Sequence, residues 1–377
     1  MREYAIVVLV TAAVTFLVTP VVRRVAVLTG VMADVRDRDV HAIPTPRLGG
    51  VGMYVGVLAG RLVADHLPVL HTVFTNYDEP RAILIAGGLI TLLGVVDDKW
   101  SLDALTKLSG QIVAAGAMVL LGLRLAFLVL PGRETAYTLT SDVSVPLTVL
   151  LVVLLVNAVN FIDGLDGLAA GVVAIAAAAQ FTFSYNLSAD QNFLRAQPGA
   201  LVAAICVGAC LGFLPHNFSP ARLFMGDSGS MLLGLMLAAS AVSTTGQFDF
   251  ATAISGFGAN NPLNLSLPLV VPVLVPLLVL AVPFADLVLA VVRRTRGGRS
   301  PFAPDKMHLH HRLLEIGHSQ RRAVLLMYAW SALIGFGGVV VSLSSNATLP
   351  LTLLAGVAIV VLLASSLPRL RTPRGPA

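Results

Sequence analysis

The sequence predicts an all-α protein that crosses a membrane many times, and three features of its composition carry this prediction. Of its 377 residues, 56% are hydrophobic and only 12% are charged. The charged share is about half of that in a typical soluble domain, and the mean hydropathy is +0.85. Long apolar runs also recur along the chain. These features are typical of an integral membrane protein.

About eleven apolar stretches are long enough to be membrane helices, because a helix needs roughly 17 to 25 residues to cross the hydrocarbon of a bilayer. The first stretch follows Arg2 and resembles a signal peptide. Its apolar run is long and no small-residue cleavage site follows, so we predict a retained span. The stretches lie near 4–22, 49–67, 81–96, 107–130, 145–162, 166–185, 199–215, 229–245, 267–292, 323–343 and 349–367.

The basic residues indicate how these spans are oriented. Most of the 25 lysines and arginines lie in the loops after spans 1, 3, 5, 7 and 9 and in the C-terminal tail. Because cytoplasmic loops carry the excess of basic residues, we predict the N-terminus outside and the C-terminus in the cytoplasm. The chain is predicted to form one membrane domain over 1–368 and a disordered tail over 369–377. Charges grouped in short loops do not suggest nucleic-acid binding, so no nucleic-acid partner is expected.

Polar clusters fall almost entirely in the loops predicted to be cytoplasmic. The run GVVDDKW ends the third span with Asp97 and Asp98, and Lys107 follows closely. Adjacent carboxylates repel each other, so a cation beside them is the natural compensation. Mg²⁺ suits this role because it prefers one or two carboxylates together with phosphate oxygens. The alternative interpretation is a solvated loop that begins with two acids.

The run NAVNFIDGLDGLAAG carries a second cluster at the end of the fifth span and directly after it. Asn157, Asn160 and Asp163 recur every third residue, so they lie along one edge of a helix. Asp166 follows within the same glycine-rich run. Glycines let the chain turn tightly and let a ligand approach the backbone. The alternative is a reverse turn between two helices, with amides capping the helix ends.

The run HNFSPARLFMGDSGSMLLG places Asp227 and Ser228 directly before the eighth span. We predict Ser228 to be an N-cap. A helix N-terminus flanked by glycines is also a ready anion site, where Asp227 is placed to hold a metal that bridges the anion. Phe224, just upstream, is either an aromatic residue at the lipid interface or a stacking platform for a base.

The loop between the ninth and tenth spans carries three histidines, His308, His310 and His311, among basic residues. This concentration of positive potential favours contact with a phosphate. A zinc site is the rival interpretation, but no cysteine and no clear third ligand accompany the histidines.

Together these clusters suit phosphoryl transfer at a membrane surface. Carboxylates for Mg²⁺, amides, glycine turns and a basic loop can bind a diphosphate and stabilise charge during transfer. The first loop adds Thr45 beside two prolines that make it rigid, although a stiff helix connector would look the same. One substrate would be a lipid that enters between helices, and the other would arrive from the cytoplasm.

Five runs, in this order, resemble the signature segments of the polyprenyl-phosphate N-acetylhexosamine-1-phosphate transferases. They are PTPRLGG, GVVDDKW, NAVNFIDGLDGLAAG, RLFMGDSGS and GRSPFAPDKMHLHHRLL. The H-x-H-H pattern and the PRLGG form resemble the GlcNAc-1-phosphate branch more than the muramoyl-pentapeptide branch. The resemblance implies UDP-GlcNAc as donor, undecaprenyl or decaprenyl phosphate as acceptor, and UMP and polyprenyl-diphosphate-GlcNAc as products. This would be the first membrane step of cell-wall or surface glycan assembly, on the cytoplasmic face of a bacterial plasma membrane.

The resemblance also implies roles for single residues and a mechanism. Mg²⁺, with Mn²⁺ as an alternative, would be bound by Asp227 and Asp98. We expect the lipid phosphate to attack the β-phosphorus in one displacement, and a covalent aspartyl intermediate is the competing mechanism. The sequence does not distinguish a monomer from a homodimer. The catalytic acids would be Asp97, Asp98, Asp163 and Asp166, and the substrate-binding residues would be Thr45, Lys107, Asn160, Asn217, Phe224, Arg293, His308, His310 and His311.

Three other functions remain open on the sequence alone. A transporter also has many spans and intramembrane acids, but here the polar residues crowd one face instead of the midplane. A CDP-alcohol phosphatidyltransferase also uses clustered aspartates, but the DG-x-x-AR pattern typical of that class is absent. A phospho-MurNAc-pentapeptide transferase is the alternative within the family that the motifs resemble.

Overall fold

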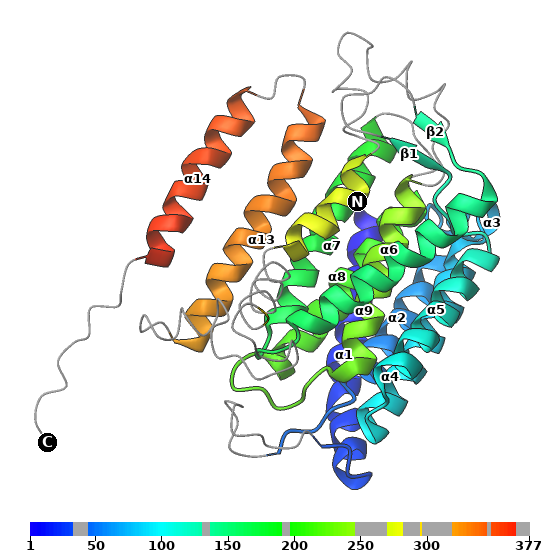
Figure 1. The fold of residues 1–377 in the computed structure, drawn as a ribbon, viewed down its shortest axis with the longest axis vertical. Helices are drawn as coiled ribbons and strands as arrows, with labels where there is room; N and C mark the ends of the chain where they lie inside the picture. Colours follow the sequence, from blue (N-terminus) through cyan, green and yellow to red (C-terminus); the bar gives the residue numbers. More distant parts are fainter. Residues whose placement is uncertain are drawn as a thin grey trace, which may run out of the picture.

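The computed structural model describes residues 1–32, 44–129, 136–190, 197–245, 270–281, 295, 319–344 and 348–366. These residues form a bundle of long helices with one small two-stranded ribbon (Figure 1). The elements are α1 (Arg2–Leu28), α2 (Gly49–Asp65), α3 (His71–Asn76), α4 (Glu79–Trp100), α5 (Ala104–Leu120), β1 (Phe127–Val129), β2 (Ala136–Thr138), α6 (Ser141–Ile162), α7 (Leu168–Asp190), α8 (Gln197–Asn217), α9 (Gly226–Thr245), α13 (Gln320–Leu343) and α14 (Thr348–Ser366), and a further helix covers Val270–Ala281.

Seven helices in the described part of the chain are long and apolar enough to cross a membrane: α1, α4, α6, α7, α8, α9 and α13. Three shorter apolar helices accompany them, at Ala104–Leu120, Val270–Ala281 and Leu349–Leu363. The prediction of a largely helical, multi-pass membrane protein is therefore confirmed. The count of eleven spans and their orientation stay predictions.

The fourth predicted span, 107–130, differs from the structure. Helix α5 ends at Leu120, and the chain then turns into β1, which pairs antiparallel with β2. Gly122 has a φ of +99°, a left-handed conformation that favours glycine and ends the helix. Leu123 and Leu125 are nevertheless buried. The apolar run therefore extends beyond the end of the helix, because its last residues are buried in the core. Hydrophobicity alone does not predict the turn.

Helix α9 lies at the centre of the bundle and is buried along its span. Helices α2, α4, α6 and α8 pack around it. Glycines allow the closest approaches: a Cβ at Gly234 would lie 2.5 Å from the Cα of Val156, and one at Gly94 would lie 2.3 Å from the Cα of Ser228. Small residues at membrane helix interfaces let backbones approach in this way. The N-terminus of α9 is thereby held inside the bundle.

The long helices run up and down, so one end of the bundle collects the C-termini of α4 and α6 and the N-termini of α5 and α9 (Figure 1). We call it the polar end, because Asp97, Asp98, Asp163 and Asp227 lie there. It is the lower end in Figure 1, and α3, β1 and β2 lie at the opposite end. Helix α13 packs against α7, and α14 packs against α13 at the side of the bundle.

Candidate active site

Asp98 holds the N-terminus of α9. Its Oδ1 accepts a hydrogen bond from the backbone N–H of Asp227 (2.8 Å). Its Oδ2 accepts from the backbone N–H of Ser228 (3.2 Å) and from the Ser228 hydroxyl (2.9 Å). A carboxylate is favoured at this position because the first N–H groups of a helix have no partner within the helix and carry partial positive charge. Asp98 therefore caps α9 from a neighbouring helix.

Ser228 is not the N-cap that we predicted. Helix α9 begins at Gly226, so Ser228 lies inside its first turn. Gly226 has a φ of +69°, and a Cβ on it would lie 2.4 Å from Oδ2 of Asp98. Glycine at this position thus gives the Asp98 carboxylate room to reach the helix from the side. The cap comes from a residue far away in sequence, which a local motif does not reveal.

Lys107 joins two carboxylates that come from different helices. Its Nζ lies 2.6 Å from Oδ2 of Asp97 and 2.9 Å from Oδ1 of Asp227. The same Oδ1 of Asp227 accepts a hydrogen bond from Nδ2 of Asn160, which also donates to the Ser230 hydroxyl (2.9 Å). Residues of α4, α5, α6 and α9 thus meet in one polar cluster, which we call the carboxylate cluster: Asp97, Lys107, Asn160 and Asp227.

The loop between α4 and α5 explains why Lys107 faces the cluster. Oδ1 of Asp97 accepts from the backbone N–H of Leu102 (2.8 Å), which folds the chain back after α4. Asp103 then caps α5, because its Oδ1 accepts from the N–H groups of Leu105 and Thr106, each at 3.0 Å. Lys107 lies one turn into α5, and the short connection returns its side chain to the end of α4.

The PRLGG run lies against the segment that leads into α9. The N–H of Phe224 donates to the carbonyl of Pro46 (2.9 Å), and the N–H of Gly49 donates to the carbonyl of Phe224 (3.1 Å). A Cβ at Gly50 would lie 2.1 Å from the backbone N of Gly229. The glycine pair therefore lets α2 touch the start of α9. Thr45, at the beginning of this segment, is buried.

The turn after α6 is tied to the loop before α9. Oδ1 of Asn217 accepts from the N–H of Gly167 (3.0 Å), and its Nδ2 donates to the carbonyl of Leu223 (3.1 Å). Oδ2 of Asp166 accepts from the N–H of Ala221 (3.0 Å). Asp166 and Asn217 are both buried. In the described structure these two predicted site residues brace the backbone around the cluster.

Asp163 is the C-cap residue of α6 and lies beyond its helical span. Burial raises the pKa of its carboxyl to about 8, and the nearby charges of Asp227 and Asp98 act in the same direction, against the opposing charge of Arg47. Removing an acid from water and placing it beside like charges both disfavour its ionised form. Below about pH 8, Asp163 therefore holds a proton unless additional positive charge enters the site.

The donor set of the carboxylate cluster fits Mg²⁺. Two carboxylates, Asp97 and Asp227, flank the Lys107 ammonium, which shows that the cluster already stabilises positive charge, and the Asn160 amide donates to one of them. Among the described residues no group of three or more His, Cys, Asp or Glu side chains could hold a metal alone. Mg²⁺ commonly uses only one or two carboxylates and completes its shell with water and phosphate. Asp98 differs from Asp97 and Asp227, because both of its oxygens are engaged by α9.

Some predicted site residues lie outside the described part of the chain. They are Arg293, His308, His310 and His311. The described structure brings Asp97, Asp98, Lys107, Asn160, Asp163 and Asp227 to the polar end, with Thr45, Asp166, Asn217 and Phe224 in the segments around them.

Two supporting side chains of the site, Ser230 and Tyr328, are not predicted from the sequence. Ser230, which accepts from Asn160, lies three residues after Asp227 on α9, so helical spacing places both on one face. Tyr328 of α13 donates its hydroxyl to the carbonyl of Gly167. Ser230 could have been predicted from its helical spacing to Asp227, whereas nothing in the sequence near Tyr328 predicts that it contacts the site.

Comparison with known proteins is consistent with this geometry. Residues 81–245 match the family model "Glycosyl transferase family 4". The chain is 46% identical to the decaprenyl-phosphate N-acetylglucosaminephosphotransferase of Mycolicibacterium smegmatis, over 89% of this chain and 82% of that protein. It is 32% identical to the probable undecaprenyl-phosphate N-acetylglucosaminyl 1-phosphate transferase of Bacillus subtilis, over 85% and 78%. It is also 32% identical to the phospho-N-acetylmuramoyl-pentapeptide-transferase of Desulforudis audaxviator, over 88% and 98%.

Proposed function

This chain belongs to glycosyl transferase family 4, and from that premise we propose that it transfers GlcNAc-1-phosphate from UDP-GlcNAc to a polyprenyl phosphate. The products are UMP and polyprenyl-diphosphate-GlcNAc. The observation that carries the proposal is the 46% identity, over 89% of the chain, to a protein named for this transfer. That relative uses decaprenyl phosphate by name, which supports decaprenyl phosphate as the acceptor here.

The carboxylate cluster supplies the groups that such a transfer needs. Asp227 and Asp97, which both contact the Lys107 ammonium, would hold Mg²⁺. When bound, Mg²⁺ supplies positive charge that neutralises diphosphate oxygens. Lys107 would then turn its charge toward the same phosphate oxygens, where an ammonium stabilises the charge that develops during transfer. Asn160 would orient Asp227 by the hydrogen bond that it already makes.

The bonds that change lie at the β-phosphorus of the donor. An oxygen of the lipid phosphate attacks this phosphorus, and the bond from it to the oxygen that bridges to UMP breaks. A phosphate monoester is mostly dianionic at neutral pH, so it needs little help from a base. Of the adjacent acids, Asp97 is the better candidate to receive a remaining proton, because its contact with Lys107 is with a movable side chain. Asp98 is committed to the backbone of α9.

The setting of this chemistry completes the proposal. The eleven-span count and the basic loops support an N-terminus outside the cell and a polar end in the cytoplasm, where nucleotide sugars are available. The enzyme would work in the plasma membrane of a bacterium. The lipid substrate would reach the polar end from the bilayer between helices.

A transfer assay tests the proposal. Purified protein would be incubated with polyprenyl phosphate and with UDP-GlcNAc labelled in the sugar, with Mg²⁺ or with a chelator. We expect Mg²⁺-dependent label in the organic extract, an equal amount of UMP, and loss of both in Asp227→Ala. Asp142→Ala is the matched control, because Asp142 is an exposed acid in the first turn of α6 at the opposite end.

The second candidate is transfer of phospho-MurNAc-pentapeptide, because a relative named for that reaction is 32% identical over 88% of the chain. Label transfer from UDP-MurNAc-pentapeptide, and none from UDP-GlcNAc, would favour that candidate. If neither donor labelled any polyprenyl phosphate offered, the transferase proposal would be wrong.

A further inference from the structure

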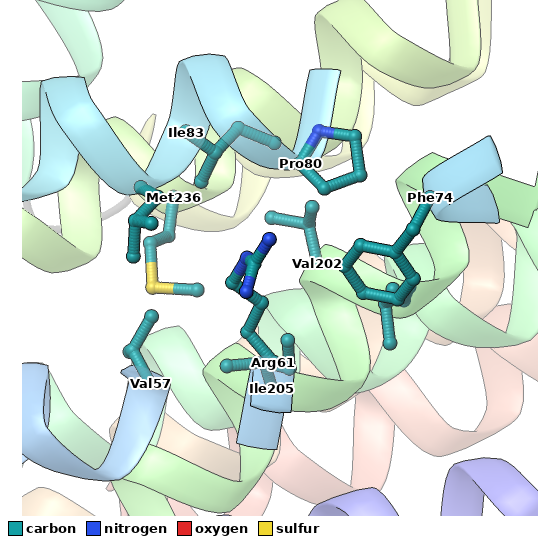
Figure 2. A pocket seen from close by; sticks show the side chains of 10 residues that line it. Val57, Arg61, Phe74, Pro80, Ile83, Val202, Ile205 and Met236 are labelled. Atoms are coloured by element: carbon teal, nitrogen blue, oxygen red, sulfur yellow. The ribbon is translucent and has the colours of Figure 1, made fainter. Parts of the chain in front are cut away.

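Arg61 lies in an apolar pocket far from the carboxylate cluster. It belongs to α2, and the pocket around it is lined by residues of α2, α3, α4, α8 and α9. Figure 2 shows its guanidinium in the middle of this pocket, between Met236 and Val202. The guanidinium carbon lies 5.2 Å from the ring centroid of Phe74, in a cation–π contact. The pocket wall around the charge is otherwise hydrocarbon.

The positive charge of Arg61 has no negative partner among the described residues. Arg61 is half-buried, and its Nε is buried and makes no hydrogen bond. Within the described residues its charge interacts only with the Phe74 ring. An ionised side chain in apolar surroundings is costly unless another charge or hydrogen bond compensates it. Ionisable residues inside membrane segments therefore commonly face a partner or a ligand.

The pocket lies near the end of the bundle opposite to the polar end. Arg61 is one helical turn before the end of α2 at Asp65, and Pro80 lies in the first turn of α4. Asp98 lies near the other end of α4, about 27 Å away along the helix axis at 1.5 Å per residue. The pocket is therefore separate from the proposed active site and close to the depth where phospholipid headgroups of the opposite leaflet lie.

The size of the pocket limits what can enter it. The pocket is partly open, and its volume of about 20 Å³ is close to the space of one water molecule. A buried water needs two to four polar partners, and this wall offers little beyond the guanidinium. A single anionic oxygen fits this pocket better than a water molecule does, because it brings the negative charge that the Arg61 guanidinium lacks as a partner. The rest of an anionic group would stay at the mouth, where Phe74 and Leu84 are partly exposed.

We propose that Arg61 and this pocket bind an anionic phospholipid. One phosphate oxygen pairs with the guanidinium, and the acyl chains lie along the apolar outer surface beside Leu84 and the exposed Ile85. The interaction gives the half-buried guanidinium a partner that the described residues do not supply. A lipid bound at this site should therefore stabilise the half of the bundle opposite to the polar end, independently of catalysis.

Thermal unfolding in two kinds of lipid tests this proposal. The full-length protein would be unfolded in micelles supplemented with phosphatidylglycerol or with phosphatidylcholine of the same acyl chains. We expect phosphatidylglycerol to raise Tm by about 2 °C or more over phosphatidylcholine. The difference should vanish in Arg61→Gln and persist in part in Arg61→Lys, which keeps the charge.

Arg124→Gln is the matched control, because Arg124 is an exposed arginine at the same end of the bundle and donates to the Ser141 hydroxyl at 2.8 Å. It should keep the full difference between the two lipids. Native mass spectrometry gives a second measurement, in which Arg61→Gln should carry fewer phosphatidylglycerol adducts than the unsubstituted protein.

Three results would overturn the proposal. The first is an equal Tm of the unsubstituted protein in both lipids. The second is a lipid difference that survives in Arg61→Gln. The third is an equal rise in Tm with inorganic phosphate, which would show an anion site that does not recognise lipid.

Discussion

Two adjacent aspartates do different work at the polar end. Asp97 accepts one backbone hydrogen bond and pairs with Lys107, whereas both oxygens of Asp98 hold the start of α9. The sequence presents them as an equivalent acidic pair. The difference arises because successive residues of a helix point about 100° apart, so Asp98 faces the backbone at the start of α9 while Asp97 faces Lys107 and the Asp227 side chain. We therefore propose that Asp97 can exchange its contact with Lys107 for a metal ion, and that Asp98 positions the start of α9.

Replacing Asp98 should damage stability more than replacing Asp97. Asp98→Ala leaves the backbone N–H groups of Asp227 and Ser228 without an acceptor and removes the shorter of the two hydrogen bonds of the Ser228 hydroxyl. This loss should lower the free energy of unfolding by roughly 2–4 kcal/mol. Asp98→Asn should lower the free energy of unfolding less than Asp98→Ala does, since its amide keeps one acceptor oxygen. Thermal unfolding of both variants beside Asp97→Asn checks this order. An unchanged Tm in Asp98→Ala would refute the capping role.

Lys107 should act as an internal counter-ion that competes with the metal. Lys107→Met leaves Asp97 and Asp227 without their ammonium, so a divalent cation should bind about tenfold more tightly. Titration with Mn²⁺, followed by electron paramagnetic resonance, measures this affinity directly. Lys99→Met is the control, because Lys99 is exposed and lies over the ring of Trp100. Equal or weaker binding in Lys107→Met would contradict the competition.

The residue types of the site could be predicted from the sequence, but their contacts could not. Asp227, Asn160 and Lys107 were singled out from separate runs, and the structure brings them together. The capping of α9 by Asp98 depends on two helices whose residues are 129 apart, so no local spacing reveals it. The same holds for Tyr328, which reaches Gly167 from another helix.

At the scale of elements, α9 is the axis on which the site is built. Its start touches α2 through Gly50 and α4 through Gly94, at separations that leave no space for a side chain. The glycines of the PRLGG run thus have a packing role beside any contact with substrate. This packing fixes where Asp227 lies relative to Asp97.

Gly50→Ala should disrupt this contact. The added Cβ would lie 2.1 Å from the backbone N of Gly229, and backbone cannot move aside as a flexible side chain can. We expect loss of at least tenfold in transfer activity and a lower Tm. Gly116→Ala is the control on α5, where nothing lies within 4 Å. That change should be neutral or stabilising, because alanine favours helix over glycine. Equal behaviour of the two variants would contradict the packing role.

Most long helices could be predicted from apolar run length, because a membrane span needs a continuous apolar surface. The predicted fourth span, 107–130, extends beyond the end of α5 at Leu120 because apolar residues also follow the helix. Leu123 and Leu125 are buried in a turn and not in a helix, and hydrophobicity records burial without recording backbone conformation. The short α3 and the ribbon of β1 and β2 were missed because each is too short to leave a periodic signal.

At the scale of the whole molecule, orientation decides which substrates can reach the polar end. Both native cysteines, Cys206 and Cys210, are buried, so introduced cysteines can be labelled with little background. An impermeant maleimide added to intact cells should label Arg2→Cys. It should not label Trp100→Cys, which lies at the polar end, until the membrane is permeabilised; Trp100 is 65% exposed. The reverse pattern would contradict the predicted orientation.

The central claim is that a sugar phosphate, and not a sugar alone, moves to the lipid. Purified protein given decaprenyl phosphate and UDP-GlcNAc labelled with ³²P at the β-phosphorus tests it most directly. We predict that the ³²P enters the organic-extractable lipid while unlabelled UMP is released, because the bond that breaks lies between the β-phosphorus and the oxygen that bridges to UMP. If the ³²P remained in water-soluble UDP while the sugar appeared in the lipid, the enzyme would be a sugar transferase that cleaves the bond at the anomeric carbon, and the account would be wrong.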